Sequence, residues 1–220
     1  MTEEKAYLEC RCGACRISLV DPQLRYRSEC LCCDCRQREL ISASKRPENK
    51  MPDEVAAYYR GVQLFYFSNA LQIEAESRAR LEFFKLSRDA LTTTGITTCC
   101  GTLMCSNHPI TQGCSIAAHA DNCTIKIPDI MPTQVVLFGC DFPDDKYNER
   151  TRRDEIPKIF SVFDELDSVP VAALLAALTK SVSAGSGDEN STTFEELLVD
   201  QEIRIDGSHF DESRLEKPDS

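Results

Sequence analysis

Cys10-Arg-Cys-Gly-Ala-Cys15 begins a series of three cysteine clusters that decides how this chain folds. The second cluster is Cys30-Leu-Cys-Cys-Asp-Cys-Arg36, and the third is Cys99-Cys-Gly-Thr-Leu103. A tight, glycine-containing turn brings neighbouring Sγ atoms close together, which is the geometry that tetrahedral zinc requires, with Zn–S bonds of about 2.3 Å. Together the clusters supply enough thiolates for two metal ions, so the sequence predicts a zinc protein.

The composition is that of a globular chain, with 220 residues, 42% hydrophobic and 28% charged. Thirteen cysteines would suit a secreted disulfide framework, but the odd number fits pairing poorly, and the N-terminus Met-Thr-Glu-Glu-Lys lacks the apolar core of a signal peptide. In a reducing compartment, clustered cysteines are more often metal ligands or reactive thiols. We therefore expect a cytoplasmic protein, with the nucleus as the alternative.

Charge and hydropathy argue against two classes of partner. The longest apolar run, residues 169–178, is half the roughly 20 residues that a membrane span requires. The net charge is -11, and residues 181–220 contribute -8 of it, with eleven acidic and three basic side chains. Binding to nucleic acid by counterion release needs clustered Lys and Arg. We expect no nucleic-acid or membrane partner, and a solvated, partly disordered acidic tail.

The cysteines also divide the chain. All of them lie between Cys10 and Cys140, which marks a metal-bearing domain over residues 1–145. Helical spacing at 156–166 and 169–182, with Pro170 in the first turn of the second segment, predicts a helical extension over 146–182. Residues 183–220 form the acidic tail, with a short helix at 193–199 for which Thr192 and Glu195 have capping-box spacing.

Within the first domain, apolar and β-branched residues that alternate with polar ones predict strands rather than helices. Residues 36–44 fit either a short helix or an irregular segment. The fold class is therefore mainly β, and the predicted strands or hairpins cover residues 7–20, 24–29, 62–67, 71–76, 81–86, 91–98, 102–105 and 134–138.

The three clusters, in this order, resemble those of the glutathione-dependent formaldehyde-activating enzyme family, which includes centromere protein V. Relatives show C-x-C-G-A-V-R-x-x-L, then C-H-C-x-x-C-R, then C-x-x-C-G-T-P-L, and the resemblance covers about Leu8 to Cys140. It implies a small antiparallel β domain, known as a β-tent, with the cysteine turns at its ends. The C-terminal helices and the acidic tail are additions to that domain.

The resemblance also implies two zinc sites, one structural and one exchangeable. The structural site would take two thiolates from the first turn and two from the late turn: Cys10, Cys12, Cys99 and Cys100. The second would take three thiolates and leave a fourth position for water or a substrate thiolate: Cys30, Cys32 and Cys35. Arg36 would pair with a carboxylate of a glutathione-like ligand, and a structural salt bridge is the alternative for this side chain.

Two departures from the family pattern affect these sites. Thr97 stands where relatives have the first cysteine of the late turn, so Cys99 is a displaced ligand, for which Cys105 and His108 are the substitutes. Leu31 replaces a histidine that is frequent in relatives, which removes a candidate acid–base group beside the open site.

The remaining cysteines and histidines have no ligand spacing. We expect Cys15 to be a buried small hydrophobe and the others to be ordinary core or surface residues: Cys114, Cys123, Cys140, His119 and His209.

Three functions are compatible with these observations. The first is a zinc-dependent carbon–sulfur lyase that acts on a glutathione or other small-thiol adduct, with no catalytic residue identified from the sequence. The second is a non-catalytic, zinc-stabilised protein-interaction module, and the third is a thiol-based metal or redox buffer. Two metals, one with an exchangeable ligand, would favour the enzyme, and a single tightly held metal would favour the module.

Overall fold

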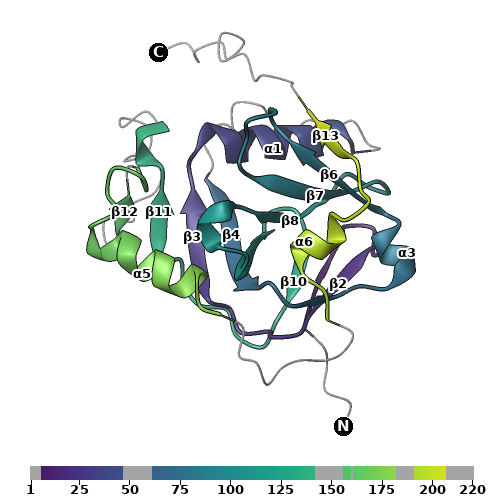
Figure 1. The fold of residues 1–220 in the computed structure, drawn as a ribbon, viewed down its shortest axis with the longest axis horizontal. Helices are drawn as coiled ribbons and strands as arrows, with labels where there is room; N and C mark the ends of the chain where they lie inside the picture. Colours follow the sequence, from purple (N-terminus) through teal and green to yellow (C-terminus); the bar gives the residue numbers. More distant parts are fainter. Residues whose placement is uncertain (1–5, 47–60, 142–155, 160, 182–190, 207–220) are drawn as a thin grey trace.

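The computed structural model describes residues 6–46, 61–141, 156–159, 161–181 and 191–206, and the strands in these ranges form two sheets (Figure 1). The small sheet contains, in spatial order, β10 (Thr124–Lys126), β1 (Tyr7–Glu9), β2 (Arg16–Leu19) and β5 (Leu71–Gln72). The large sheet contains, in spatial order, β12 (Lys158–Ile159), β11 (Val135–Leu137), β3 (Tyr26–Cys30), β4 (Val62–Ser68), β9 (Ser115–His119), β8 (Leu103–Asn107), β7 (Thr93–Thr97), β6 (Leu81–Lys85) and β13 (Ile203–Ile205). The prediction of a mainly β fold is confirmed.

The large sheet is mixed rather than purely antiparallel, which corrects the sequence-based expectation. Its centre, from β3 to β6, is antiparallel. Its two edges are parallel, because β11 pairs with β3 and β12, and β13 pairs with β6. Parallel neighbours need long crossover connections, and β11 and β13 both return to the sheet after long excursions of the chain. Hairpin patterns alone could not predict these edges.

The large sheet buries both of its faces, as the alternation along β4 shows. Phe65 and Phe67 point into a core shared with Leu8 and Ile17 of the small sheet. Leu64 and Tyr66 point to the opposite face, into a second core. Helix α5 (Val169–Leu178) closes this core with its buried residues Val171, Leu174 and Leu178. Side chains that alternate between faces are the normal consequence of strand geometry, so a seven-residue strand separates two cores.

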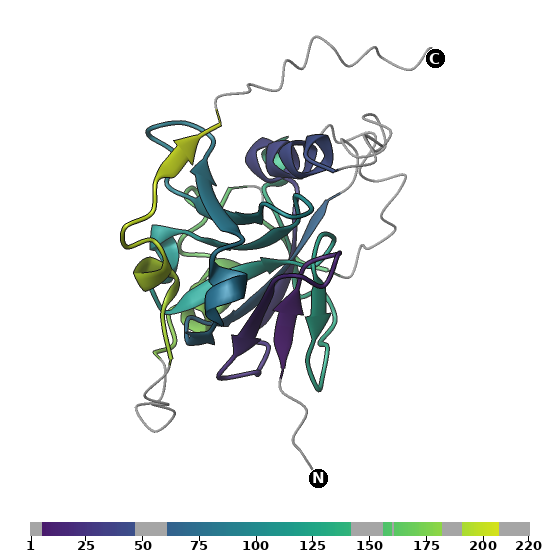
Figure 2. The ribbon, with the colours of Figure 1, turned by 90° about the vertical axis from the view of Figure 1, so that its right-hand side faces the viewer.

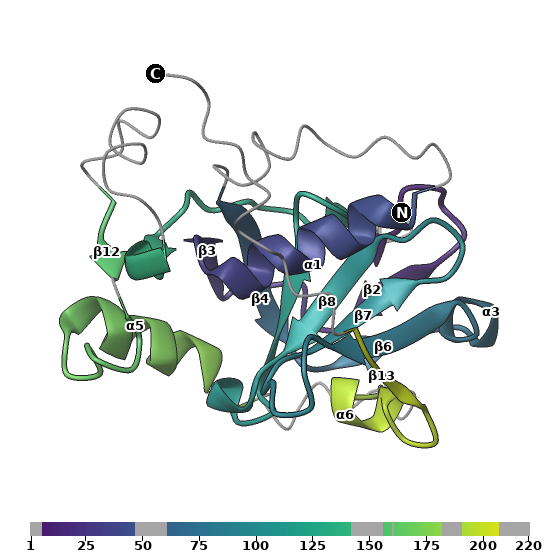
Figure 3. The ribbon, with the colours of Figure 1, turned by 90° about the horizontal axis from the view of Figure 1, so that it is seen from above.

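Helix α1 (Cys33–Ser44) follows β3 after two residues and lies along the sheet (Figure 3). Cys32 is its N-cap, and the Cys32 Sγ accepts a hydrogen bond from the Cys35 N–H at 3.3 Å. Ile41 packs with Phe84 and Leu103 from the sheet, which holds the helix in place. The segment 36–44, which the sequence left as helix or irregular, is therefore helical, and the helix begins inside the second cysteine cluster.

Two sequence-based predictions about elements are wrong in part, and other elements were missed. Residues 156–166 are not a helix, because Lys158 and Ile159 pair with β11 as an edge strand and turns follow. The predicted strand 71–76 ends at Gln72, and a short helix, α3 (Ala75–Arg78), takes up its second half. Strands β9 and β10 and two 3-10 turns, η1 (Pro109–Thr111) and η2 (Gly139–Asp141), were not predicted.

Residues 191–206 of the acidic tail belong to the fold. Thr192 forms an isolated bridge with Leu71, helix α6 (Phe194–Leu197) follows, and β13 then pairs with β6 (Figure 2). Phe194 is 0% exposed and meets the ring of Phe83 edge-on, with centroids 5.5 Å apart. The capping box exists, but one residue later than predicted, at Thr193 and Glu196.

The flexible tail predicted for residues 183–220 therefore does not extend over 191–206. Its other parts, 183–190 and 207–220, lie outside the described residues. Among the helices that the structure describes, none has the length and apolar character needed to cross a membrane.

Candidate metal centres and the adjoining cavity

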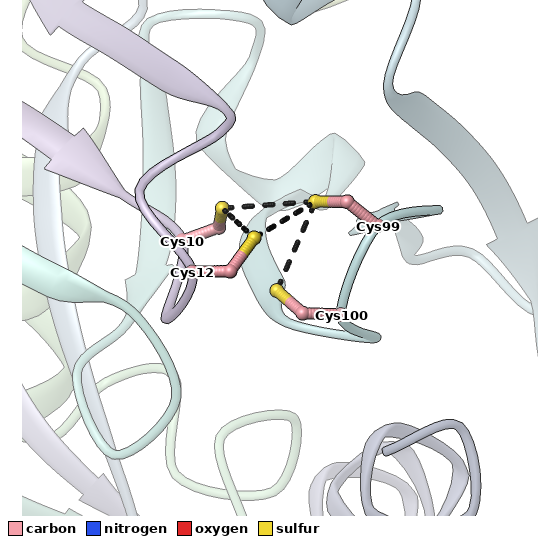
Figure 4. Close-up of side chains that lie close together, drawn as sticks. All are labelled: Cys10, Cys12, Cys99 and Cys100. Atoms are coloured by element: carbon pink, nitrogen blue, oxygen red, sulfur yellow. Dashed lines mark hydrogen bonds between the residues drawn. The ribbon is translucent and has the colours of Figure 1, made fainter. Parts of the chain in front are cut away.

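The first centre contains four sulfur atoms brought together by two hairpin turns (Figure 4). Cys10 and Cys12 come from the turn between β1 and β2 in the small sheet, and Cys99 and Cys100 come from the turn between β7 and β8 in the large sheet. The centre therefore joins the two sheets.

The sulfur–sulfur distances in this centre match a tetrahedral thiolate site. They are 3.5 Å for Cys10–Cys12, 3.8 Å for Cys10–Cys99, 3.4 Å for Cys12–Cys99 and 3.8 Å for Cys99–Cys100. A tetrahedron with Zn–S bonds of about 2.3 Å has sulfur–sulfur edges of about 3.8 Å. The residues present thus fit a zinc ion, and both cysteines of the late turn contribute.

The late turn takes its shape from Gly101 and two threonines. Gly101 has φ +65°, and a Cβ there would lie 2.6 Å from the Cβ of Lys45 in the α1 C-cap. The Thr97 hydroxyl accepts from the Thr102 N–H at 3.0 Å and lies 3.5 Å from the Cys100 Sγ. Thr97 thus supports the turn that carries Cys99 and Cys100, and Cys99 supplies the fourth sulfur of the group.

The thiols of this centre differ in acidity. Burial opposes ionisation of Cys100, but hydrogen bonds from the Thr102 and Thr97 hydroxyls outweigh it and lower the pKa of Cys100 to about 6. Burial, followed by a hydrogen bond with Cys12, raises the pKa of Cys99 to about 12, and burial also raises the pKa of Cys10. One negative charge is therefore easy to form here, and further ionisation needs a cation.

The second centre is local in sequence. Cys30 ends β3, Cys32 caps α1, and Cys35 lies in the first turn of that helix, with all three sulfurs within 4.8 Å of one another. The Cys30 Sγ donates to the Cys32 Sγ at 3.2 Å. The neighbouring Cys33 is exposed and lies outside this group, and its N–H donates to the Asp141 carboxylate at 3.1 Å.

The thiols of the second centre also differ in pKa. Hydrogen bonds from the Cys30 and Cys32 thiols hold the pKa of Cys35 well below its ordinary value. Hydrogen bonding to Cys32 and Cys35, together with burial, raises the pKa of Cys30 far above its ordinary value. Three buried sulfurs can ionise together only beside a cation, so this donor set also fits zinc, with three protein ligands rather than four.

The second centre lines a cavity of about 400 Å³. Its other walls come from β4, β8, β9, β11, the η1 turn and α5, and they are largely apolar, with Leu64, Leu137 and Leu174 among them. This is within the size range of small-molecule sites. Residues of α1 and α5 both line the cavity, and Figure 1 shows α1 above and α5 to the lower left of the strands β3 and β4.

Two histidines line the same cavity. The His119 Nε2 lies 2.7 Å from the Ser106 Oγ, and its Nδ1 lies 3.9 Å from the Glu39 Oε1. His119 is 1% exposed, and neither its Nδ1 nor the Glu39 Oε1 has a hydrogen-bond partner among the described residues. Burial, followed by the positive charge of Arg38, lowers the pKa of His108, so this second imidazole is neutral near pH 7.

The sequence-based expectations for the two histidines need correction. His108 was considered as a ligand for the late turn, but it lies in the cavity beside the second centre. His119, expected to be an ordinary histidine, is a buried member of the same cavity, and the run Ser115–His119 carried no strand prediction that would have placed it there. Leu31 packs against Val136 and Ile156, and the imidazoles that line the cavity are those of His108 and His119.

Arg36, for which a ligand carboxylate or a structural salt bridge was expected, is a buried side chain. It is 4% exposed, its Nη2 donates to the Asp141 carbonyl at 3.0 Å, and it is not among the described residues that line the cavity. Arg38, which the sequence did not single out, does line the cavity.

The other cysteines lie outside both centres. Cys15 and Cys105 are 0% and 2% exposed in the main core, so Cys105 is not a substitute ligand. Cys123 is buried, and its Sγ donates to the His119 carbonyl at 3.3 Å, whereas Cys114 is half-buried. Among the cysteines whose side chains the structure describes, none forms a disulfide. The side chain of Cys140 and all of His209 lie outside the described residues.

Comparison with known proteins found no match for this chain among protein-family models, curated proteins or solved structures.

Proposed function

We propose that this protein is a zinc-dependent carbon–sulfur lyase that acts on a glutathione or other small-thiol adduct, as a divergent member of the glutathione-dependent formaldehyde-activating enzyme family. The observation that carries the proposal is the three-thiolate centre of Cys30, Cys32 and Cys35 in the wall of a cavity of about 400 Å³. A centre with three protein ligands beside a cavity is how catalytic zinc sites are built, whereas the four-thiolate centre is built like a structural site.

The proposed reaction breaks the carbon–sulfur bond of a hydroxyalkyl thioether. The sulfur leaves as a thiolate, the hydroxyl loses its proton and a carbonyl forms. Zinc held by the three thiolates would offer its fourth position to that sulfur and stabilise it as an anion. The remaining requirement is a group that accepts the hydroxyl proton in a cavity with apolar walls.

His119 meets this requirement. Its Nε2 is hydrogen-bonded to the Ser106 Oγ at 2.7 Å. The Ser106 hydroxyl can therefore give its proton to the imidazole while it takes the proton of the substrate hydroxyl. The Glu39 carboxylate, 3.9 Å from Nδ1, stabilises the imidazolium that results. The apolar walls exclude water and keep the carbonyl product from adding water within the site.

The test uses zinc-loaded protein and matched cysteine variants. Native mass spectrometry should find two zinc ions per chain and a glutathione adduct. Cys32→Ser should lose one zinc and glutathione binding, but it should retain a cooperative melt because the four-thiolate centre is untouched. Cys33→Ser, a change at the exposed neighbour outside the centre, is the control and should behave like the wild type.

Activity is measured separately, as the exchange between glutathione, formaldehyde and their adduct followed by NMR. His119→Gln should slow this exchange by about 100- to 10,000-fold if the imidazole is the proton acceptor, while glutathione still binds. Glutathione that binds equally well to Cys32→Ser would contradict the proposal.

A zinc-stabilised interaction module is the second candidate, and one observation favours it. Around the start of α5, three large apolar side chains are exposed: Phe163 (58%), Leu166 (51%) and Val169 (82%). An exposed apolar group of this kind is typical of a binding surface. A protein with one tightly held zinc and no affinity for thiols would support this function over the lyase. The cytoplasmic or nuclear location stays a prediction for either function.

A further inference from the structure

Arg38 is a buried cation with unused hydrogen-bond donors. It is 2% exposed, and neither its Nε nor its Nη2 has a hydrogen-bond partner among the residues that the structure describes. Its nearest carboxylate oxygen is the Asp34 Oδ2, 3.7 Å from Nη2, which is beyond hydrogen-bond distance. Leaving buried donors of a charged group unpaired is costly, so this side chain is arranged for an acceptor.

An acceptor can reach Arg38 from the cavity that it lines together with the three-thiolate centre. Arg38 and Cys35 are three residues apart on α1, so they lie on the same face of the helix, with Cβ atoms about 5–6 Å apart. His108 lines the same cavity, and the positive charge of Arg38 follows burial among the causes that lower the pKa of His108. This neighbour is close enough to respond to the charge, but it leaves the Nε and Nη2 of Arg38 without a hydrogen-bond partner.

Two carboxylates in the cavity wall do not fill this role. Asp34 is 54% exposed at its side chain, so water screens its charge. Asp141 is engaged at the α1 N-terminus, where its Oδ2 accepts from the Cys33 N–H at 3.1 Å. The donors of Arg38 therefore remain available on the cavity side.

We propose that Arg38 binds a carboxylate on the thiol substrate, so that the preferred substrates are adducts of short mercapto acids. This inference rests on the proposed function, because the thiol of the same molecule must occupy the three-thiolate centre. The Nε and Nη2 donors form one edge of the guanidinium, which binds a carboxylate with two parallel hydrogen bonds. Because Arg38 and Cys35 lie one helical turn apart on α1, we expect the carboxylate to be two or three carbons from the sulfur.

The experiment compares 3-mercaptopropionate with its neutral amide, 3-mercaptopropionamide, which has nearly the same shape. Binding to the zinc-loaded full chain is measured by calorimetry at equal thiolate concentrations. The wild type should bind the acid about 10- to 100-fold more tightly, since hydrogen bonds to charged groups have effects of this size. Arg38→Met should bind both thiols alike, with the affinity for the amide close to that of the wild type.

Two further variants keep the test decisive. Arg16→Met removes a half-exposed guanidinium on β2, whose partner is Glu9, and should leave the preference for the acid unchanged. Arg38→Lys keeps the charge but removes the paired donors, so it should retain only part of the preference. If Arg38→Met fails to fold, the wild type and Arg38→Lys still decide the question.

Each outcome has one meaning. Equal affinities of the wild type for the acid and the amide would overturn the carboxylate site and leave the proposed lyase intact. An unchanged preference in Arg38→Lys or Arg38→Met would overturn it as well. Failure of both short thiols to bind, while glutathione binds, would also overturn the carboxylate site alone. Failure of glutathione to bind as well would overturn the proposed function, and the carboxylate site with it.

Discussion

Replacing Gly101 by alanine tests whether the late turn is as tightly held as the structure indicates. At φ +65°, any residue with a Cβ costs about 1–2 kcal/mol in backbone strain. The new methyl group would also lie 2.6 Å from the Cβ of Lys45 and 3.1 Å from the Ser42 carbonyl oxygen. Overpacking of this kind adds about 1–3 kcal/mol, so Gly101→Ala should destabilise the protein by about 2–5 kcal/mol.

Gly13→Ala is the matched control, because Gly13 has φ +74° in the other ligand turn and an added Cβ would meet nothing within 4 Å. It should cost only the strain of about 1–2 kcal/mol. For a chain of this size each kcal/mol lowers Tm by about 2–4 °C, so zinc-loaded Gly101→Ala should melt several degrees below Gly13→Ala.

A second measurement, competition for zinc with a chromophoric chelator, should show weaker binding in Gly101→Ala, because the α1 backbone pushes the turn that carries Cys100 away. Equal melting temperatures for the two variants would refute the close approach of α1 to the late turn.

Three other predictions concern the ligands and the tail. Cys99→Ser and Cys100→Ser should each reduce the zinc content measured by mass spectrometry, whereas Cys105→Ser should not; retention of both zincs in Cys99→Ser would exclude it as the fourth ligand. Zinc binding to the four-thiolate centre should release fewer protons at pH 7.5 than its four thiols, because the pKa of Cys100 is already about 6. The affinity for zinc should fall as the pH is lowered through 6, since protons then compete for the Cys100 thiolate too. Calorimetry in buffers of different ionisation enthalpy measures the number of protons released. Release of one proton per thiol would contradict the low pKa of Cys100. Phe194→Ala should lower the free energy of unfolding by about 3–5 kcal/mol, because the ring is fully buried against Phe83; an unchanged denaturant midpoint would show that α6 is not part of the core.

The ligand groups could be predicted because their spacing is a local property of the sequence. Cys30, Cys32 and Cys35 lie within six residues, and the strand-to-helix transition that aligns them needs no distant partner. Assembly of the four-thiolate centre depends on contacts across 87 residues between Cys12 and Cys99. The prediction of this group therefore came from a resemblance to known patterns rather than from spacing.

The cavity could not be predicted, because its key side chains become neighbours only in the folded sheet. His119 comes from β9, whose sequence Ser-Ile-Ala-Ala-His alternates too weakly to be read as a strand. Arg38 can be assigned to the cavity only if the helix is predicted correctly over the second cluster. The parallel edges of the large sheet could not be predicted for a similar reason. Strand β12 has two residues, and its pairing with β11 is decided by the rest of the fold.

Helix α1 physically connects the two centres. Its first turn carries Cys35, and near its other end Ser42 Oγ donates to the Gly101 carbonyl at 2.6 Å, in the turn that holds Cys99 and Cys100. Between them, Glu39 accepts from Asn122, whose Oδ1 lies 2.7 Å from the same Ser42 Oγ. A metal that orders the start of this helix also orders the support of the other ligand turn.

Because the two groups of cysteines lie at different positions along the chain, zinc would bind to them in a fixed order during synthesis. The Cys30–Cys35 centre is complete once the first 35 residues have left the ribosome, while the other must wait for Cys100 and must close a loop of 87 residues between Cys12 and Cys99. An ion captured early would hold α1 ready to receive the late turn when it emerges. The centre with three sulfurs would thereby act as an assembly template for the centre with four.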